Sequence, residues 1–208
     1  MAKQEKPKAK RSDRIIGRRY RYTGDYQVVP AIGSNGRPQK QLLYTGDWVM
    51  PLNEPEEYRR LVRWLRMLTA VAAAAVVCAT QVLPAPTTNK WFLPVLVVSF
   101  FPLAYQIMGA FRMPAERKRM ERQEYDKSFL RLRHTAVFTL VLICLSALGT
   151  GIYWIVAAGG KLEGAAPYSL RDGIFAGLLV LAAAAELLIR KRAGSLRTET
   201  VENAVRED

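Results

Sequence analysis

Apolar residues gather in four long runs, and polar or basic segments separate these runs. The first run, 67–83, holds no charged residue over 17 positions. The others span 91–111, 135–158 and 173–189. Each has about the length that a helix needs to cross a bilayer. The pattern predicts an all-α integral membrane protein whose four transmembrane helices form one domain, 53–192.

The first helix is expected to begin before its apolar run. Asn53 is a favourable N-cap residue, and Glu56 stands three positions later. Nothing between Glu56 and Leu83 breaks a helix. We therefore expect one continuous helix of roughly 30 residues, whose first turns lie outside the bilayer.

The segment 18–51 carries a repeated motif, Tyr-Thr-Gly-Asp followed by an aromatic residue. The copies occupy 22–26 and 44–48, and a Gly-Ser-Asn-Gly-Arg-Pro turn sequence lies between them at 33–38. The segment is therefore predicted to form a small β-hairpin on the cytoplasmic side.

Side-chain alternation chooses the register of this hairpin. If paired residue numbers sum to 70, Tyr22 faces Trp48 and Tyr26 faces Tyr44, with all four aromatics on one face. A tight Asn-Gly turn would shift the pairing by one residue, so we favour the first register. A lone hairpin is marginal in water. Its aromatic face needs a surface: its own membrane domain, the lipid interface or a second protein.

Basic residues set the orientation. Of 31 Lys and Arg, 28 lie in three segments, 1–66, 112–133 and 190–208. The positive-inside rule places these segments, and both termini, in the cytoplasm of what we expect to be a bacterial cell membrane. Anionic lipid headgroups are their expected contacts. The net charge of +13 is thereby accounted for, and no nucleic-acid partner is expected.

Both chain ends are polar. Residues 1–17 are basic and poor in apolar side chains, which predicts a disordered tail. The segment 193–208 is predicted to be a fraying polar tail. No signal peptide is expected before the first apolar run. Cys78 and Cys144 lie inside apolar runs and are interpreted as small buried hydrophobic residues.

The loop 112–133 mixes charges with good helix formers. Its composition predicts that the second and third helices continue beyond the bilayer. Tyr125, Phe129 and Leu132 form an apolar stripe along it, and the hairpin is expected to dock there.

Three residues in or beside the apolar runs are candidates for function. Glu186 is the one acid inside a run, and an ionisable residue in a membrane is a functional candidate by default. The alternative is an interfacial ion pair with Arg190, one turn away. His134, the only histidine, has no companion ligand for a metal and is interpreted as interfacial. Pro102 is expected to kink the second helix.

Small residues mark a packing face on the fourth helix. Gly173, Gly177 and Ala184 fall on one side of it. Such a face allows close helix approach, either to the first helix or to a second copy in a homodimer.

The chain contains no phosphate loop, nucleophile elbow or zinc-protease helix, so catalysis and a cofactor are not expected. The first functional hypothesis is a scaffold or regulatory protein that binds a cytoplasmic or membrane partner through its hairpin and basic helix ends. The alternative is a small, dimeric transporter or channel that uses Pro102 and Glu186. The third is an enzyme acting on lipid beside His134.

Overall fold

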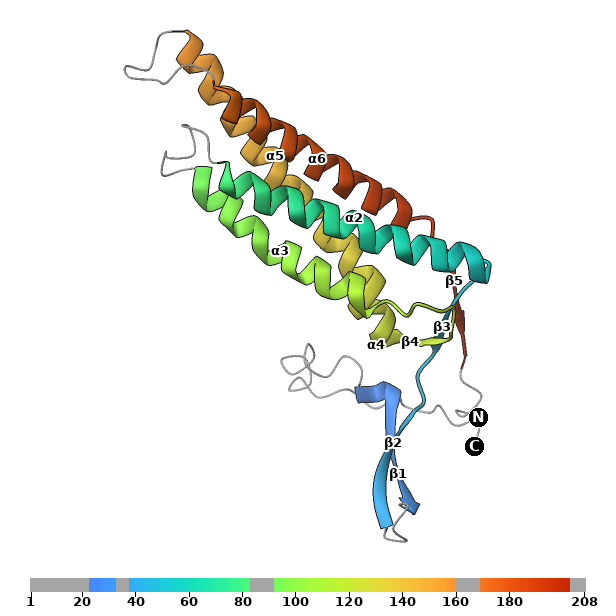
Figure 1. The fold of residues 1–208 in the computed structure, drawn as a ribbon. Coiled ribbons are helices and arrows are strands. Elements are labelled where there is room, and N and C mark those ends of the chain that lie inside the picture. The colour runs from blue at the N-terminus through green and yellow to red at the C-terminus, as the bar shows by residue number, and fades with distance from the viewer. Residues whose placement is uncertain (1–22, 33–37, 83–91, 160–168, 203–208) are drawn as a thin grey trace, which may run out of the picture.

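The computed structural model describes residues 23–32, 38–82, 92–159 and 169–202. Four long helices pack side by side, and short strands lie at one end of the bundle (Figure 1). All four helices are long and apolar enough to cross a membrane. They are α2 (Pro55–Gln81), α3 (Phe92–Arg112), α5 (Arg131–Ala158) and α6 (Leu170–Ala193). The four predicted helices are thus confirmed.

Helix α2 is unbroken over its 27 residues, as predicted. The expected N-cap is wrong by one residue: Glu54 is the N-cap, and Pro55 begins the helix. Proline fits this position because the first N–H of a helix needs no intrahelical partner. The Asn53 side chain instead accepts a hydrogen bond from the backbone N–H of Arg197, at 3.1 Å.

Only one of the two helix extensions predicted for the loop between α3 and α5 is present. Helix α3 runs through Pro102 and ends at Arg112, so the expected extension of the second helix is wrong. Pro114 follows two residues later and cannot continue a helix. The third helix does extend outward. A short strand, β4 (Met120–Glu121), leads into α4 (Arg122–Tyr125) and a π-helical turn (Asp126–Leu130) that joins α5.

The predicted hairpin is present. Strands β1 (Tyr26–Ile32) and β2 (Pro38–Tyr44) pair antiparallel, with Tyr26 opposite Tyr44, so the predicted register is confirmed. The hairpin is shorter than expected because Thr23–Asp25 forms a 3₁₀ turn. The Asp25 carbonyl accepts both the Thr45 and Gly46 N–H groups, which ends the ladder. Tyr22 and the predicted tail 1–17 lie outside the described residues.

A second sheet corrects two further predictions. Strand β3 (Trp48–Pro51) lies between β4 and β5 (Thr198–Val201). Trp48 is paired with Glu121 and Val201, so its expected place in the hairpin is wrong. The segment predicted to fray contains β5, because Thr-Glu-Thr-Val has the β-branched residues that favour a strand. This sheet joins three distant parts of the chain.

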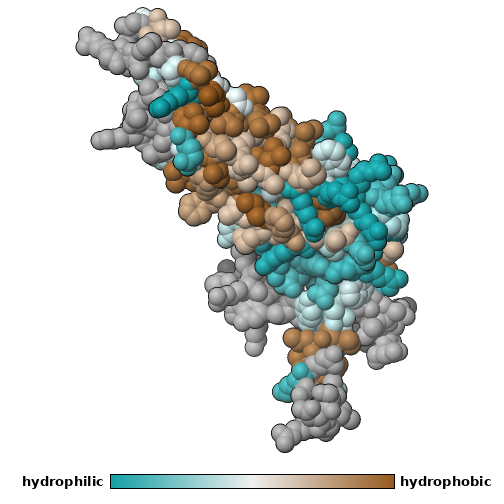
Figure 2. Space-filling model, viewed as in Figure 1, coloured by the Kyte–Doolittle hydropathy of each residue, from teal (hydrophilic) through white to brown (hydrophobic). Residues whose placement is uncertain are grey.

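Two apolar clusters form the core of the bundle. The cluster near the sheets includes Tyr58, Leu65, Phe129 and Leu132, and Tyr125 packs against it, so the predicted stripe is directed inward. The other cluster includes Val76, Leu103, Ile143, Phe175 and Leu179. Figure 2 shows apolar surface along the helices, polar surface where the bundle meets β3, β4 and β5, and a smaller apolar patch over the β1–β2 hairpin.

The small-residue face of α6 does not pack within the chain. Gly177 and Ala184 are exposed, and a Cβ added at Gly177 would meet nothing within 4 Å; Gly173 is half-buried. Helix α6 does pack against α2, as expected, but its buried side carries other residues, among them Phe175 and Ala182. The expectation that the face with Gly177 and Ala184 makes this contact is wrong, and its use in a homodimer stays a prediction.

The two cysteines also differ from expectation. Cys78 and Cys144 are exposed on the outer faces of α2 and α5. Both runs are apolar all round, so the pattern did not distinguish the inner face from the outer one.

Candidate functional site

A layer of polar side chains crosses the core between the two apolar clusters. Each long helix contributes one member, and all four are fully buried. These residues, called the polar layer below, are Thr69, Gln106, Thr139 and Glu186. Buried polar groups are costly unless they are hydrogen-bonded. The partners of this layer therefore determine what it can do.

Three members of the polar layer form a connected chain of hydrogen bonds. The Gln106 Nε2 donates to Glu186 Oε2 at 2.8 Å. The Thr139 hydroxyl lies 3.3 Å from Gln106 Oε1 and 3.0 Å from the carbonyl oxygen of Thr135. The Thr69 hydroxyl donates to the carbonyl of Leu65 in its own helix. The chain of bonds thus links α3, α5 and α6.

Glu186 is not the interfacial residue that its distance from Arg190 suggested. Its side chain is fully buried, whereas Arg190 is exposed. The ion pairs found within the described residues are Arg59–Glu116 and Lys118–Glu124, so the expected Glu186–Arg190 pair is not formed. Glu186 Oε1 has no hydrogen-bond partner in the described part of the chain.

Sequence reasoning missed that Glu186 is bonded to Gln106 and that Gln106 is bonded in turn to Thr139. The available signal was weak: each is a polar residue inside an apolar run. Polar residues are common enough in such runs that position alone selects none of them. The contact also depends on the rotation of three helices about their axes, which the runs do not specify.

The base of the hairpin is a second candidate site. Tyr26 and Tyr44 meet edge to face with ring centroids 5.2 Å apart, and Trp48 packs on Tyr44 at 4.9 Å. The Tyr26 hydroxyl donates to the Glu121 carboxylate. The Tyr44 hydroxyl donates to the Asp47 carbonyl at 2.7 Å and accepts the Arg122 N–H at 3.1 Å. The hairpin is therefore fixed to the loop before α5.

These contacts change the acid–base properties of both tyrosines. Burial, followed by the hydrogen bond to Glu121, raises the pKa of Tyr26 above its ordinary value. Burial also raises the pKa of Tyr44, although the bond from Arg122 acts in the opposite direction. The hairpin was expected to dock on the apolar stripe of Tyr125, Phe129 and Leu132. Its described hydrogen bonds instead join it to the Glu121 carboxylate and the Arg122 N–H.

Farther out, the hairpin carries exposed apolar side chains. Val28 and Leu42 are cross-strand partners, with 60% and 67% of their surfaces exposed. Leu43, on the other face, is 40% exposed. The base of the hairpin is thus packed, while its outer part offers an apolar surface.

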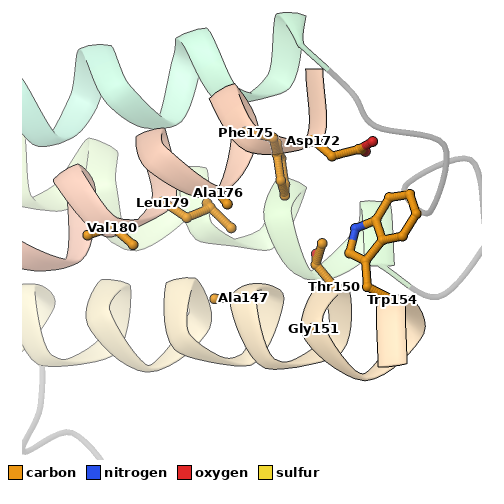
Figure 3. A pocket seen from close by; sticks show the side chains of 9 residues that line it. All are labelled: Ala147, Thr150, Gly151, Trp154, Asp172, Phe175, Ala176, Leu179 and Val180. Carbon is orange, nitrogen blue, oxygen red and sulfur yellow. The ribbon is translucent and has the colours of Figure 1, made fainter. Parts of the chain in front are cut away.

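A cavity of about 160 Å³ lies between α5 and α6, at the end of the bundle away from the sheets (Figure 3). Trp154 and Asp172 lie at one end of it and Val180 at the other. Asp172 forms a capping box with Ser169, whose N–H and hydroxyl both donate to Asp172 Oδ2. The rest of the lining is mostly apolar, from Ala147, Gly151, Phe175, Ala176 and Leu179.

His134 and Pro102 are the two remaining candidates. His134 is exposed on α5. Within the described residues, no group of three or more His, Cys, Asp or Glu is placed to hold a metal ion. Pro102 is half-buried within α3, where it leaves the Val98 carbonyl without its usual helical donor.

Four helices of this length and composition suggest a multi-pass membrane protein. Comparison of the chain with protein-family models, curated proteins and solved structures finds no match.

Proposed function

We propose that this protein is a multi-pass protein of a bacterial cell membrane and that it works without catalysis, as a scaffold or regulatory protein. In this proposal both termini and the sheets face the cytoplasm, in agreement with the distribution of basic residues. The hairpin and the basic helix ends bind a protein partner.

The observation that carries the proposal is the contrast between the two parts of the hairpin. Its base is fixed by Tyr26 and Tyr44, while Val28 and Leu42 stay exposed beyond it. Fixing an apolar pair in one place lowers the entropy lost when a partner binds it. An exposed apolar group of this kind is typical of a binding surface.

The partner is expected to be acidic around an apolar centre. Exposed basic side chains surround the sheet end of the bundle, among them Arg59, Arg60, Arg63, Lys118 and Arg119. Complementary charge would steer the partner to this end and make its association sensitive to salt.

Orientation is tested first, by labelling single cysteines with a membrane-impermeant maleimide. After Cys78 and Cys144 are replaced by serine, cysteine is introduced at Lys40 or at Leu170, which are exposed toward opposite ends of the bundle. Leu170→Cys should react in intact cells, and Lys40→Cys only after the membrane is opened. The reverse pattern would overturn the proposed topology.

Partner binding is tested by cross-linking and capture from membranes. Wild type should capture a protein in constant ratio to itself. Val28→Ser/Leu42→Ser should no longer capture that protein. Leu43→Ser, on the other face of the same strand, is the matched control and should retain it. Raising the salt should weaken capture. Equal recovery of every protein by all three chains would refute the proposal.

The polar layer favours a second candidate function, a small transporter or channel. A carboxyl group buried among polar residues of other helices is the arrangement used by ion and proton pathways in membranes. Proteoliposomes given a pH or salt gradient would test it. Identical fluxes through wild type and Glu186→Gln would remove its main support. For the lipid-enzyme hypothesis, the described residues place no partner group beside His134.

A further inference from the structure

We propose that Glu186 is a proton-binding site in the core of the bundle. By rotating through a half turn, the Gln106 side-chain amide can hydrogen-bond to Glu186 both when Glu186 is ionised and when it is protonated. The site consists of Glu186, Gln106, Thr139 and the Thr135 carbonyl. This inference goes beyond the scaffold function and does not depend on it.

An ionised Glu186 would be poorly compensated. Its described donor is a single amide N–H from Gln106, and Oε1 has no partner among the described residues. A buried carboxylate normally needs a paired cation and several donors. No ion pair to Glu186 is formed in the described part of the chain.

The charged groups on the packed helices are directed elsewhere. On α2, Arg66 is engaged by the Ala110 and Met113 carbonyls. On α5, Arg131 lies over the Tyr105 ring at 5.6 Å. Arg112 on α3, Arg133 and His134 on α5, and Arg190 on α6 are exposed. The layer itself contributes only the neutral side chains Thr69, Gln106 and Thr139.

A neutral Glu186 fits the same heavy-atom positions better. Rotating the Gln106 amide by a half turn exchanges its oxygen and nitrogen, which have almost the same shape. The Glu186 hydroxyl at Oε2 then donates to Gln106 Oε1. Gln106 Nε2 donates to the Thr139 oxygen, and the Thr139 hydroxyl donates to the Thr135 carbonyl.

In this arrangement the Glu186 hydroxyl, one Gln106 N–H and the Thr139 hydroxyl each point toward an acceptor. The groups left over are the second Gln106 N–H and Glu186 Oε1, and Oε1 is then a neutral carbonyl oxygen instead of half of a charged carboxylate. Binding adds one proton from the medium to Glu186 and breaks no covalent bond. A larger cation such as Na⁺ would need several ligands, and within the described residues no group of three or more His, Cys, Asp or Glu side chains is placed to hold a metal ion.

Infrared difference spectroscopy of the full-length protein in lipid tests the proposal. Wild type at neutral pH should show the C=O stretch of a protonated carboxyl group, and the band should shift in D₂O. Glu186→Gln should lose this band. Asp172→Asn, which removes the other buried carboxyl side chain of α6, should keep it.

A second variant keeps the site testable if Glu186→Gln does not fold. Gln106→Leu retains Glu186 but removes the acceptor of its proton, so the band should remain and move to higher frequency. Absence of the band from wild type at neutral pH would overturn the proposal. So would a band that survives Glu186→Gln, or one that keeps its frequency in Gln106→Leu. None of these readouts depends on partner capture or on transport.

Discussion

Gln106 in α3 and Glu186 in α6 are 80 positions apart in the chain, and the Gln106 amide nitrogen lies 2.8 Å from a Glu186 carboxyl oxygen. Few other polar contacts cross between helices in the apolar part of the bundle that the structure describes. A sliding or rotation of α6 against α3 would break this bond, whereas apolar contacts tolerate such changes. The pair therefore specifies how the helices align, in the way that buried polar residues fix register in coiled coils.

Removing one member of this pair should cost more than removing both. Gln106→Leu takes away the described hydrogen-bond partner of Glu186, and we expect the free energy of unfolding to fall by about 1–3 kcal/mol. Gln106→Leu/Glu186→Leu should recover most of that loss, because neither polar group then remains in the core. Unfolding in mixed micelles, followed by circular dichroism, gives the free energy of unfolding of each variant in this double-mutant cycle. Additive losses would contradict the expected coupling.

The two glycines of the repeated motif should respond differently to alanine. At Gly46 an added Cβ would come within 2.7 Å of Asp25 Cβ and 2.8 Å of the Tyr44 hydroxyl oxygen. At Gly24 it would meet nothing within 4 Å. Gly46→Ala should therefore destabilise the base of the hairpin by about 1–3 kcal/mol, as overpacking does. Gly24→Ala is the matched control.

Hydrogen exchange of the β1 and β2 amides would report the difference between these variants. Faster exchange is expected in Gly46→Ala than in wild type. Equal protection of both alanine variants would mean that Asp25 and Tyr44 move aside without cost, and that the close contact at Gly46 does not hold the hairpin base together.

The raised pKa of Tyr26 predicts how hairpin docking depends on pH. Because the folded state holds this proton more tightly, the stabilisation is fully present below the ordinary tyrosine pKa of about 10. It is lost as the pH rises from there through the folded-state value. The denaturation midpoint of wild type should fall more steeply above pH 10 than that of Tyr26→Phe.

Ultraviolet absorbance of tyrosinate gives an independent reading of the same group. The difference between wild type and Tyr26→Phe should contain one tyrosine that ionises late. If the tyrosine that Tyr26→Phe removes ionises at the ordinary tyrosine pKa, the hydroxyl of Tyr26 is not held by Glu121.

The sequence predicted those elements whose cause is local. Four apolar runs are sufficient for four helices, and side-chain alternation was sufficient for the Tyr26–Tyr44 register. The errors lie where a distant segment decides the outcome. Trp48 joined β4 and β5 because Glu121 and Val201 pair with it, and the Asn53 side chain accepts a hydrogen bond from the Arg197 N–H instead of capping α2.

The candidate site shows the same limit. Glu186 was recognisable as an acid in an apolar run, but its partner was expected to be Arg190, its neighbour along the helix. The true partner, Gln106, depends on which faces of α3 and α6 meet. Helices that are apolar all round carry little information about that choice, so the sequence identified one residue of the site and not its geometry.

Arg66 should matter more than its neighbour Arg63, although both are basic residues of α2. Arg66 Nη2 donates to the Met113 carbonyl at 2.6 Å, and its Nε donates to the Ala110 carbonyl at 3.3 Å. The last carbonyls of a helix lack intrahelical partners, and a cation near that end is favourable. Arg66 thus caps α3 from the adjacent helix, while Arg63 is exposed.

Arg66→Gln should therefore lower the free energy of unfolding by about 1.5–3 kcal/mol, the range for hydrogen bonds to charged groups. Arg63→Gln makes the same change of charge on the same helix and should alter it by less than about 0.5 kcal/mol, as exposed substitutions usually do. Hydrogen exchange at the end of α3 should accelerate only in Arg66→Gln. Equal effects of the two substitutions would assign the role of Arg66 to its charge alone, because a cap acts through the specific carbonyls that it contacts.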